Sequence, residues 1–232
     1  MPEPSITLNL DTDHFPDEGL YLIFPDSKRL ALIKKDIEAI TKEYWTDPQR
    51  ISPALKKVIE FQPCSHCPQH GHDVLCNALR PLLPYIQEVD QYMSYDKVTA
   101  VYRGNDPSFF CVSHTTMQQA IKYLAILSLG HYCEMSERYS KYFDGVIPLM
   151  DQQSLIKRIY SNIYVENKGN RNVISEVIKE FKKEMLESTR CLINRLKYLC
   201  KNDAFVNAFV NANLLADMLE VEEPETPSKL KN

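Results

Sequence analysis

Short segments in the first half of the chain are apolar or alternate between apolar and polar residues, as β-strands do. The segments 20–24 and 29–33 flank a turn-forming Pro-Asp-Ser-Lys sequence, so we expect them to pair as a hairpin. A second hairpin is predicted from 96–103 and 108–113, and 5–10 is a further short strand. The pattern therefore predicts a small antiparallel sheet.

Helical spacing occurs between these strands. Residues 34–45 predict a short helix, and 52–61 fit either a helix or a strand. Asp73 is suited to begin a helix, because apolar residues follow it three and four positions apart. Pro81 breaks or kinks that helix, and Pro84 can open a second one that runs to about residue 92.

After Ser113 the pattern becomes almost entirely helical. Apolar residues and one histidine recur on a single helical face, namely Met117, Ile121, Leu124, Leu127 and His131. Further helices are predicted at 151–167, with Asp151 as a cap, and after Asp203, which can cap the last helix.

The longest predicted element runs from Val173 to Cys200. At about 1.5 Å per residue it spans roughly 42 Å. Its apolar stripe has a spacing close to that of coiled coils and consists of Ile174, Ile178, Phe181, Met185, Leu192, Leu196 and Leu199. This stripe can either pair with another helix or pack within the same chain.

These elements predict an α+β protein. A small antiparallel sheet with a cysteine-rich loop, residues 1–113, precedes a predominantly helical half, residues 114–220, which packs on it. The charged, proline-containing end at 221–232 is predicted to be a disordered tail.

Composition excludes several classes of function. The net charge is −4 and basic residues are interspersed with acidic ones, which argues against binding to duplex nucleic acid or to an anionic membrane. The longest apolar runs are too short to span a bilayer. The N-terminus lacks the basic and apolar regions of a secretory signal, and the cysteine count is odd, so we expect a reducing, cytoplasmic location.

Candidate chemistry is concentrated in "PCSHCPQHGHDVLC", residues 63–76, which holds three of the seven cysteines and three of the six histidines. Two residues separate Cys64 from Cys67, so one tight loop can direct both sulfurs to a single point. Cys76 would lie in the first turn of the helix predicted from Asp73, where the helix dipole favours a thiolate. The spacing predicts a metal site with these three ligands.

A structural metal site needs a fourth ligand, and the spacing leaves several candidates. His70 or His72 would complete the site within the loop at a low cost in loop entropy. Cys133, or the nearby His131, would instead join the loop to the helical half. Zinc is favoured by the histidines of the loop, and an iron–sulfur cluster is the alternative.

Other chemical motifs are absent from the sequence. It contains neither a Gly-rich nucleotide-binding motif nor a Walker loop, an H-E-x-x-H or a G-x-S-x-G. No catalytic residue is identified in the sequence, so a role other than catalysis is favoured. Three further cysteines on apolar segments, Cys111, Cys191 and Cys200, are interpreted as packing residues.

The order of several motifs resembles an uncharacterised bacterial family, a domain of unknown function. The resemblance rests on "CSHCP", the cysteine of "VLCNAL", "SYDKVTAVYR", a helix that ends near a cysteine, and "KNDAFVNAFV", over about residues 60–215. The family pattern has four cysteines, and the resemblance implies that Cys64, Cys67, Cys76 and Cys133 occupy those four positions, which favours Cys133 as the fourth ligand. Around Cys133 the sequence "HYCEMS" departs from the family pattern.

Together these observations predict a cytoplasmic metal-binding protein whose four-cysteine site, holding zinc or an iron–sulfur cluster, is mainly structural. It would act as a binding, regulatory or scaffold protein, with a protein partner or a second copy bound through the helical half. The alternatives are an iron–sulfur or metal-dependent redox enzyme and a sensor of thiol oxidation or metal.

Overall fold

The structure is a computed structural model that describes residues 14–33, 36–39, 42, 53–60, 64, 67–68, 76–106 and 108–218. The predicted strand at 5–10, the tail at 221–232 and the two candidate ligands His70 and His72 lie outside these residues.

A four-stranded antiparallel sheet forms one part of the molecule. Its strands are β1 (Gly19–Ile23), β2 (Arg29–Leu32), β3 (Lys97–Arg103) and β4 (Phe110–Thr116), in the order β2-β1-β3-β4. β1 pairs with β2 and β3 with β4, so both predicted hairpins are confirmed. The central β1–β3 pair is also antiparallel and joins the two hairpins.

The two faces of the sheet are buried in different environments. Leu20, Leu22 and Ala100 belong to the main core, which the helices cover. Tyr21 and Val101 lie on the opposite face in a small second cluster. This alternation follows from the period of two along a strand.

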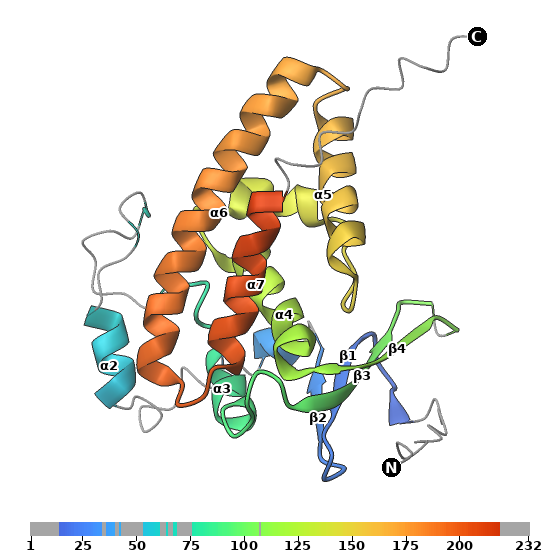
Figure 1. Ribbon diagram of the computed structural model, residues 1–232, viewed down its shortest axis with the longest axis vertical. Coiled ribbons are helices and arrows are strands. Elements are labelled where there is room, and N and C mark those ends of the chain that lie inside the picture. The colour runs from blue at the N-terminus through green and yellow to red at the C-terminus, as the bar shows by residue number, and fades with distance from the viewer. Residues whose placement is uncertain are drawn as a thin grey trace.

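The remainder of the described chain is mostly helical, so the α+β class is confirmed. The helices are α2 (Pro53–Glu60), α3 (Leu83–Val89), α4 (Met117–Leu127), α5 (Gln152–Glu166), α6 (Arg171–Leu199) and α7 (Ala204–Met218). A π-helical turn, Ser128–Tyr132, extends α4, and a 3₁₀ helix follows at Glu137–Phe143. Figure 1 shows α7 alongside α6, with α4 leading from the sheet into the helical part.

Three further sequence expectations can be compared with these elements. Asp151 caps α5 as predicted, since its carboxylate accepts a hydrogen bond from the Ser154 amide at 2.9 Å. Residue 113, where the sequence was divided into two regions, lies inside β4, and the division itself stays a prediction. Within the described residues, the helices are too short or too polar to cross a bilayer.

The apolar stripe of α6 is buried within the chain's own core. Six of its seven members are at most 6% exposed, and Leu199 is half-buried. The stripe therefore packs within the same chain, which was one of the two interpretations of its spacing. Between Met185 and Leu196 the buried face also carries polar side chains, namely Ser188, Thr189, Cys191 and Arg195.

The helix predicted from Asp73 is wrong for the residues that the structure describes. Residues 77–82 form successive turns, and α3 begins only at Leu83, with a proline in its first turn as expected for Pro84. The amides of Leu79, Arg80 and Leu82 bond to carbonyls three residues earlier. Pro81 explains the difference, because it has no amide hydrogen and would clash within a continuing α-helix.

Two aspartates hold the α6–α7 connection against the segment that enters β3. The Asp90 carboxylate accepts hydrogen bonds from the amides of Lys201 and Asn202, each at 2.9 Å. The Asp203 carboxylate accepts from the amide and the hydroxyl of Ser94, each at 2.8 Å. Asp203 does precede α7, but its side chain joins two distant segments and also accepts from the Asn207 side chain.

We predict that Asp203→Ala lowers the free energy of unfolding by about 1 kcal/mol, a value reduced for solvent screening. Partial burial favours a higher pKa for Asp203, but the hydrogen bonds from Ser94 outweigh it and lower the pKa below the ordinary 3.8. The carboxylate therefore stabilises the fold above that value, and the contribution is lost as pH falls through the lowered pKa.

Denaturant titration of the wild type, Asp203→Ala, Ser94→Ala and the double variant checks this prediction. The losses in free energy of unfolding of the two single variants should add up to more than the loss of the double variant. The difference in stability between wild type and Asp203→Ala should shrink in acid. Strict additivity at neutral pH would contradict the proposed pairing.

Candidate metal centre

Five cysteines line one small enclosed pocket, which we call the cysteine pocket. Its volume is about 20 Å³. The lining residues come from the loop after α2, the turn before α3, the end of α4 and the middle of α6: Cys64, Cys67, Cys76, Asn77, Ala78, Cys133, Glu134, Met135, Ser188, Cys191, Leu192 and Arg195. All four predicted ligands are therefore neighbours in space, although they are far apart in sequence.

Cys133 is directed into the pocket by the π-helical turn at the end of α4. Its amide bonds to the Ser128 carbonyl at 3.1 Å, which closes the wider turn of a π-helix. The backbone then becomes extended at Cys133, and its thiol donates to the Ser188 hydroxyl on α6 at 3.5 Å. π-helical turns are frequent at functional sites, because the extra residue redirects the side chains that follow.

Cys76 is positioned by the turns that replace the predicted helix. The buried Ser128 hydroxyl donates to the Ala78 carbonyl, and the side-chain amide of Asn77 donates to the Glu134 carboxylate at 2.7 Å. These two contacts fix the Cys76 turn against the segment that carries Cys133. Glu134, which also lines the pocket, is the acceptor of the hydrogen bond from Asn77.

Cys64 and Cys67 lie in a tight turn, as the C-x2-C spacing predicted. The Cys67 amide bonds to the Cys64 carbonyl at 2.9 Å, and both side chains are half-buried. The turn therefore presents both cysteines to the same pocket.

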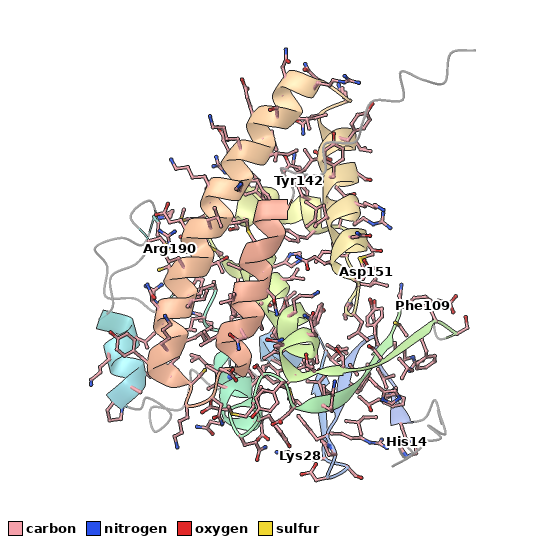
Figure 2. All side chains as sticks on the ribbon, in the orientation of Figure 1. His14, Lys28, Phe109, Tyr142, Asp151 and Arg190 are labelled. Carbon is pink, nitrogen blue, oxygen red and sulfur yellow. The ribbon has the colours of Figure 1, made fainter. Side chains whose placement is uncertain are left out.

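Cys191 and Arg195 complete the pocket from α6, and the sequence interpretation missed both. They are four residues apart, so they share one helical face, and the Arg195 guanidinium donates to Cys191 Sγ at 2.9 Å. Arg195 is only 2% exposed. Figure 2 shows that Arg190, one position earlier, projects from α6 away from α7. The polar interruption of the α6 stripe was the signal that could have revealed them.

Cys64 and Cys191 both line the cysteine pocket, and each shifts the pKa of the other. A thiol hydrogen bond to Cys191 raises the pKa of Cys64, and burial together with the thiols of Cys191, Cys133 and Cys76 raises it further. The same hydrogen bond lowers the pKa of Cys191 despite its burial, and the Arg195 charge lowers it further.

Cys76 does not have the stabilised thiolate that the predicted helix start suggested. Burial raises the pKa of its thiol to about 11, although the Arg195 charge and the amides of Ala78 and Leu79 act in the opposite direction. No helix N-terminus favours the thiolate here, because the described residues that follow Cys76 form turns. A metal ion bound at Cys76 would have to displace this thiol proton.

Of the remaining candidate ligands, His131 is among the described residues, and it does not line the cysteine pocket. His131 lines a separate surface cavity of about 550 Å³ that borders the cysteine pocket at Cys133. Among the described residues, no three His, Cys, Asp or Glu side chains stand close enough together to hold a metal ion as they are. All seven cysteines lie in the described part of the chain, and none forms a disulfide.

Histidines and cysteines away from the pocket have ordinary surroundings. His114 is exposed on β4 and bonds to Thr99 at 2.9 Å, and His14 lies beside the sheet (Figure 2). Cys200 is half-buried at the end of α6, where burial raises the pKa of its thiol to about 12. Cys111 is half-buried on β4, so the packing interpretation fits Cys111 and Cys200 but not Cys191.

We predict that Ser128→Ala lowers the free energy of unfolding by about 1–3 kcal/mol, because it leaves the buried Ala78 carbonyl without its donor. The matched control is Ser136→Ala. Ser136 is equally buried, but its hydroxyl donates to the Met185 sulfur at 3.8 Å, a weak acceptor. Urea denaturation should show a clearly smaller loss for the control, and equal losses would contradict the prediction.

Comparison with known proteins gives a family but no activity. The family described as Domain of unknown function (DUF6901) matches residues 24–231. Neither a curated protein nor a solved structure matches the chain. The suspected membership in an uncharacterised family is thereby confirmed, whereas the cysteine pattern ascribed to that family stays a prediction. The chain belongs to the DUF6901 family, whose function is unknown.

Proposed function

We propose that the protein binds one zinc ion in the cysteine pocket, through Cys64, Cys67, Cys76 and Cys133, and that this metal is mainly structural. The observation that carries the proposal is the convergence of these four cysteines, which were selected from the sequence alone, on one enclosed pocket. Four thiolates at about 2.3 Å around one ion are a common structural zinc site.

The size of the pocket favours a single ion over a cluster. About 20 Å³ is close to the space that one water-sized atom occupies. An iron–sulfur cluster adds several iron and sulfide atoms within its ring of cysteines. Such a group would require the walls to separate much further than a zinc ion does.

The charge of Arg195 also supports thiolate ligation. Four thiolates around a divalent cation carry a net charge of about −2, which is costly to bury without compensation. The buried guanidinium next to Cys191 supplies a positive charge at the wall of the pocket. It already opposes the rise in the pKa of Cys76 that burial causes.

Binding requires the sulfurs to move closer to one another than they are in this structure. Cys64 and Cys67 are the ligands that we expect to move, because they lie in a short turn and are half-buried. Cys76 and Cys133 are held by the Ser128 and Asn77 contacts. Zinc would then join the C-x2-C loop to the helical part of the fold.

A cytoplasmic location and a scaffold or regulatory role are part of this proposal, because accessible thiols persist in reducing compartments. The partner surface in the helical part remains a prediction. It would have to lie outside the stripe of α6, whose side chains are occupied within the chain.

Elemental analysis of purified protein tests the proposal. We expect about one zinc per chain, a colourless solution, and a loss of stability on chelation. Serine at any one of the four ligands should weaken zinc binding by at least about a hundredfold, more than the loss of an outer-shell partner costs. Cys111→Ser, on β4, is the matched control and should retain zinc.

Other outcomes would reject the proposal in distinct ways. A brown protein with iron and sulfide would indicate an iron–sulfur centre and reopen the redox-enzyme alternative. Wild-type protein that remains metal-free after zinc addition and dialysis would rule out the site. Full zinc binding by Cys133→Ser would remove the connection to the helical part and favour a histidine ligand.

A further inference from the structure

A cavity of about 630 Å³ lies between the sheet and α4, and its described lining shares no residue with the cysteine pocket. Its walls come from the start of β1, the segment after β2, the end of β3, α4 and the loop that joins the 3₁₀ helix to α5. Cavities of roughly 300–1,000 Å³ are the usual size of small-molecule sites. The proposed zinc site leaves this space without a function.

The wall of this cavity is largely apolar and aromatic. Tyr102, Leu127 and Phe143 are buried there, and Tyr123 and Ile126 are half-buried. A wall of this kind holds the apolar body of a ligand, because contact with it removes apolar surface from water. The faces of aromatic rings also attract a positive charge.

The charged groups of the lining are of one sign. Glu18, Glu38 and Asp144 are exposed carboxylates from three separate segments. Neither a lysine nor an arginine is among the described residues that line the cavity, although Arg158 lies beside Gly145, which does line it. The whole chain has 27 basic and 31 acidic residues, so this one-sided lining differs from the average surface. A ligand of positive charge is therefore favoured.

The arrangement of the carboxylates favours an organic cation over a metal ion. A metal ion needs several oxygen ligands within about 2.6 Å. Among the described residues, no three His, Cys, Asp or Glu side chains stand close enough together for this, and these carboxylates surround about 630 Å³, whereas the cysteine pocket encloses about 20 Å³. An organic molecule can place its charged end at a carboxylate and fill the remaining space with its body.

We propose that this cavity binds a small organic cation, with a protonated amine at the carboxylates and an apolar or aromatic body against Tyr123 and Phe143. The size of the cavity and its apolar wall carry the proposal, and the carboxylates decide the charge of the ligand. This binding is separate from the cysteine pocket and does not depend on a metal.

Calorimetric titration of the full-length protein with two matched probes tests the proposal. Tryptamine and indole-3-propionate have the same ring and the same two-carbon chain, but the first ends in an ammonium group and the second in a carboxylate. We expect tryptamine to bind at least about tenfold more tightly, because the carboxylates attract one probe and repel the other. Its affinity should fall as salt is added, since exposed charges are screened.

Variants of the lining locate the bound probe. Glu18→Gln and Asp144→Asn should each weaken tryptamine binding by about threefold, the effect of one exposed charge contact. Ile126→Trp should abolish binding by filling the cavity. Glu176→Gln is the matched control, because Glu176 is an exposed carboxylate on α6 outside the cavity and its loss changes the net charge equally. The control should bind tryptamine as the wild type does.

Several results would overturn the proposal. Indole-3-propionate that binds as tightly as tryptamine would show that the charge of the lining does not select the ligand, and failure of both probes to bind at about 10 mM would show that the cavity is not a site for them. Displacement of tryptamine by an equal concentration of calcium would indicate a metal site instead. Unchanged affinity in both carboxylate variants would place the probe elsewhere. These variants alter exposed side chains, so their folding is not at risk if Ile126→Trp fails to fold.

Discussion

The arrangement of the cysteine pocket follows from one constraint, the burial of a guanidinium group on α6. Arg195 is 2% exposed, and a charge removed from water costs several kcal/mol unless polar or charged partners surround it. Cys191 accepts a hydrogen bond from Arg195, and four further cysteines line the same pocket. The buried cation and the cluster of thiols therefore belong to a single site.

Local patterns predicted the elements that depend on local physics. The hairpins, the Asp151 cap and the long α6 helix follow from alternation, capping chemistry and a sustained apolar stripe. The turns at 77–82 were missed because the apolar spacing there resembles that of a helix, while Pro81 prevents one from continuing. Spacing identified Cys64, Cys67 and Cys76, and Cys133 was added by family resemblance, yet neither could show that α6 would approach them.

Cys191 and Arg195 illustrate why the rest of the site could not be predicted. A cysteine on an apolar helical face is usually a small packing residue, and an arginine is usually in contact with solvent. Their roles arise only when Cys64 lines the same pocket as α6 and when Cys133 is directed inward by the π-helical turn. Those contacts depend on the tertiary fold, whereas sequence spacing reports only what is near along one element.

Asp90 and Asp203 fix the C-terminal end of α6, because both carboxylates accept hydrogen bonds across the α6–α7 connection. Cys191 lies about 12 Å from Leu199 along the helix axis, whereas Arg171 at the far end lies about 42 Å from it, at about 1.5 Å per residue. The part of α6 that lines the cysteine pocket is therefore only about two helical turns from this anchored end. The position of one wall of the pocket thus depends on two carboxylates that do not touch it.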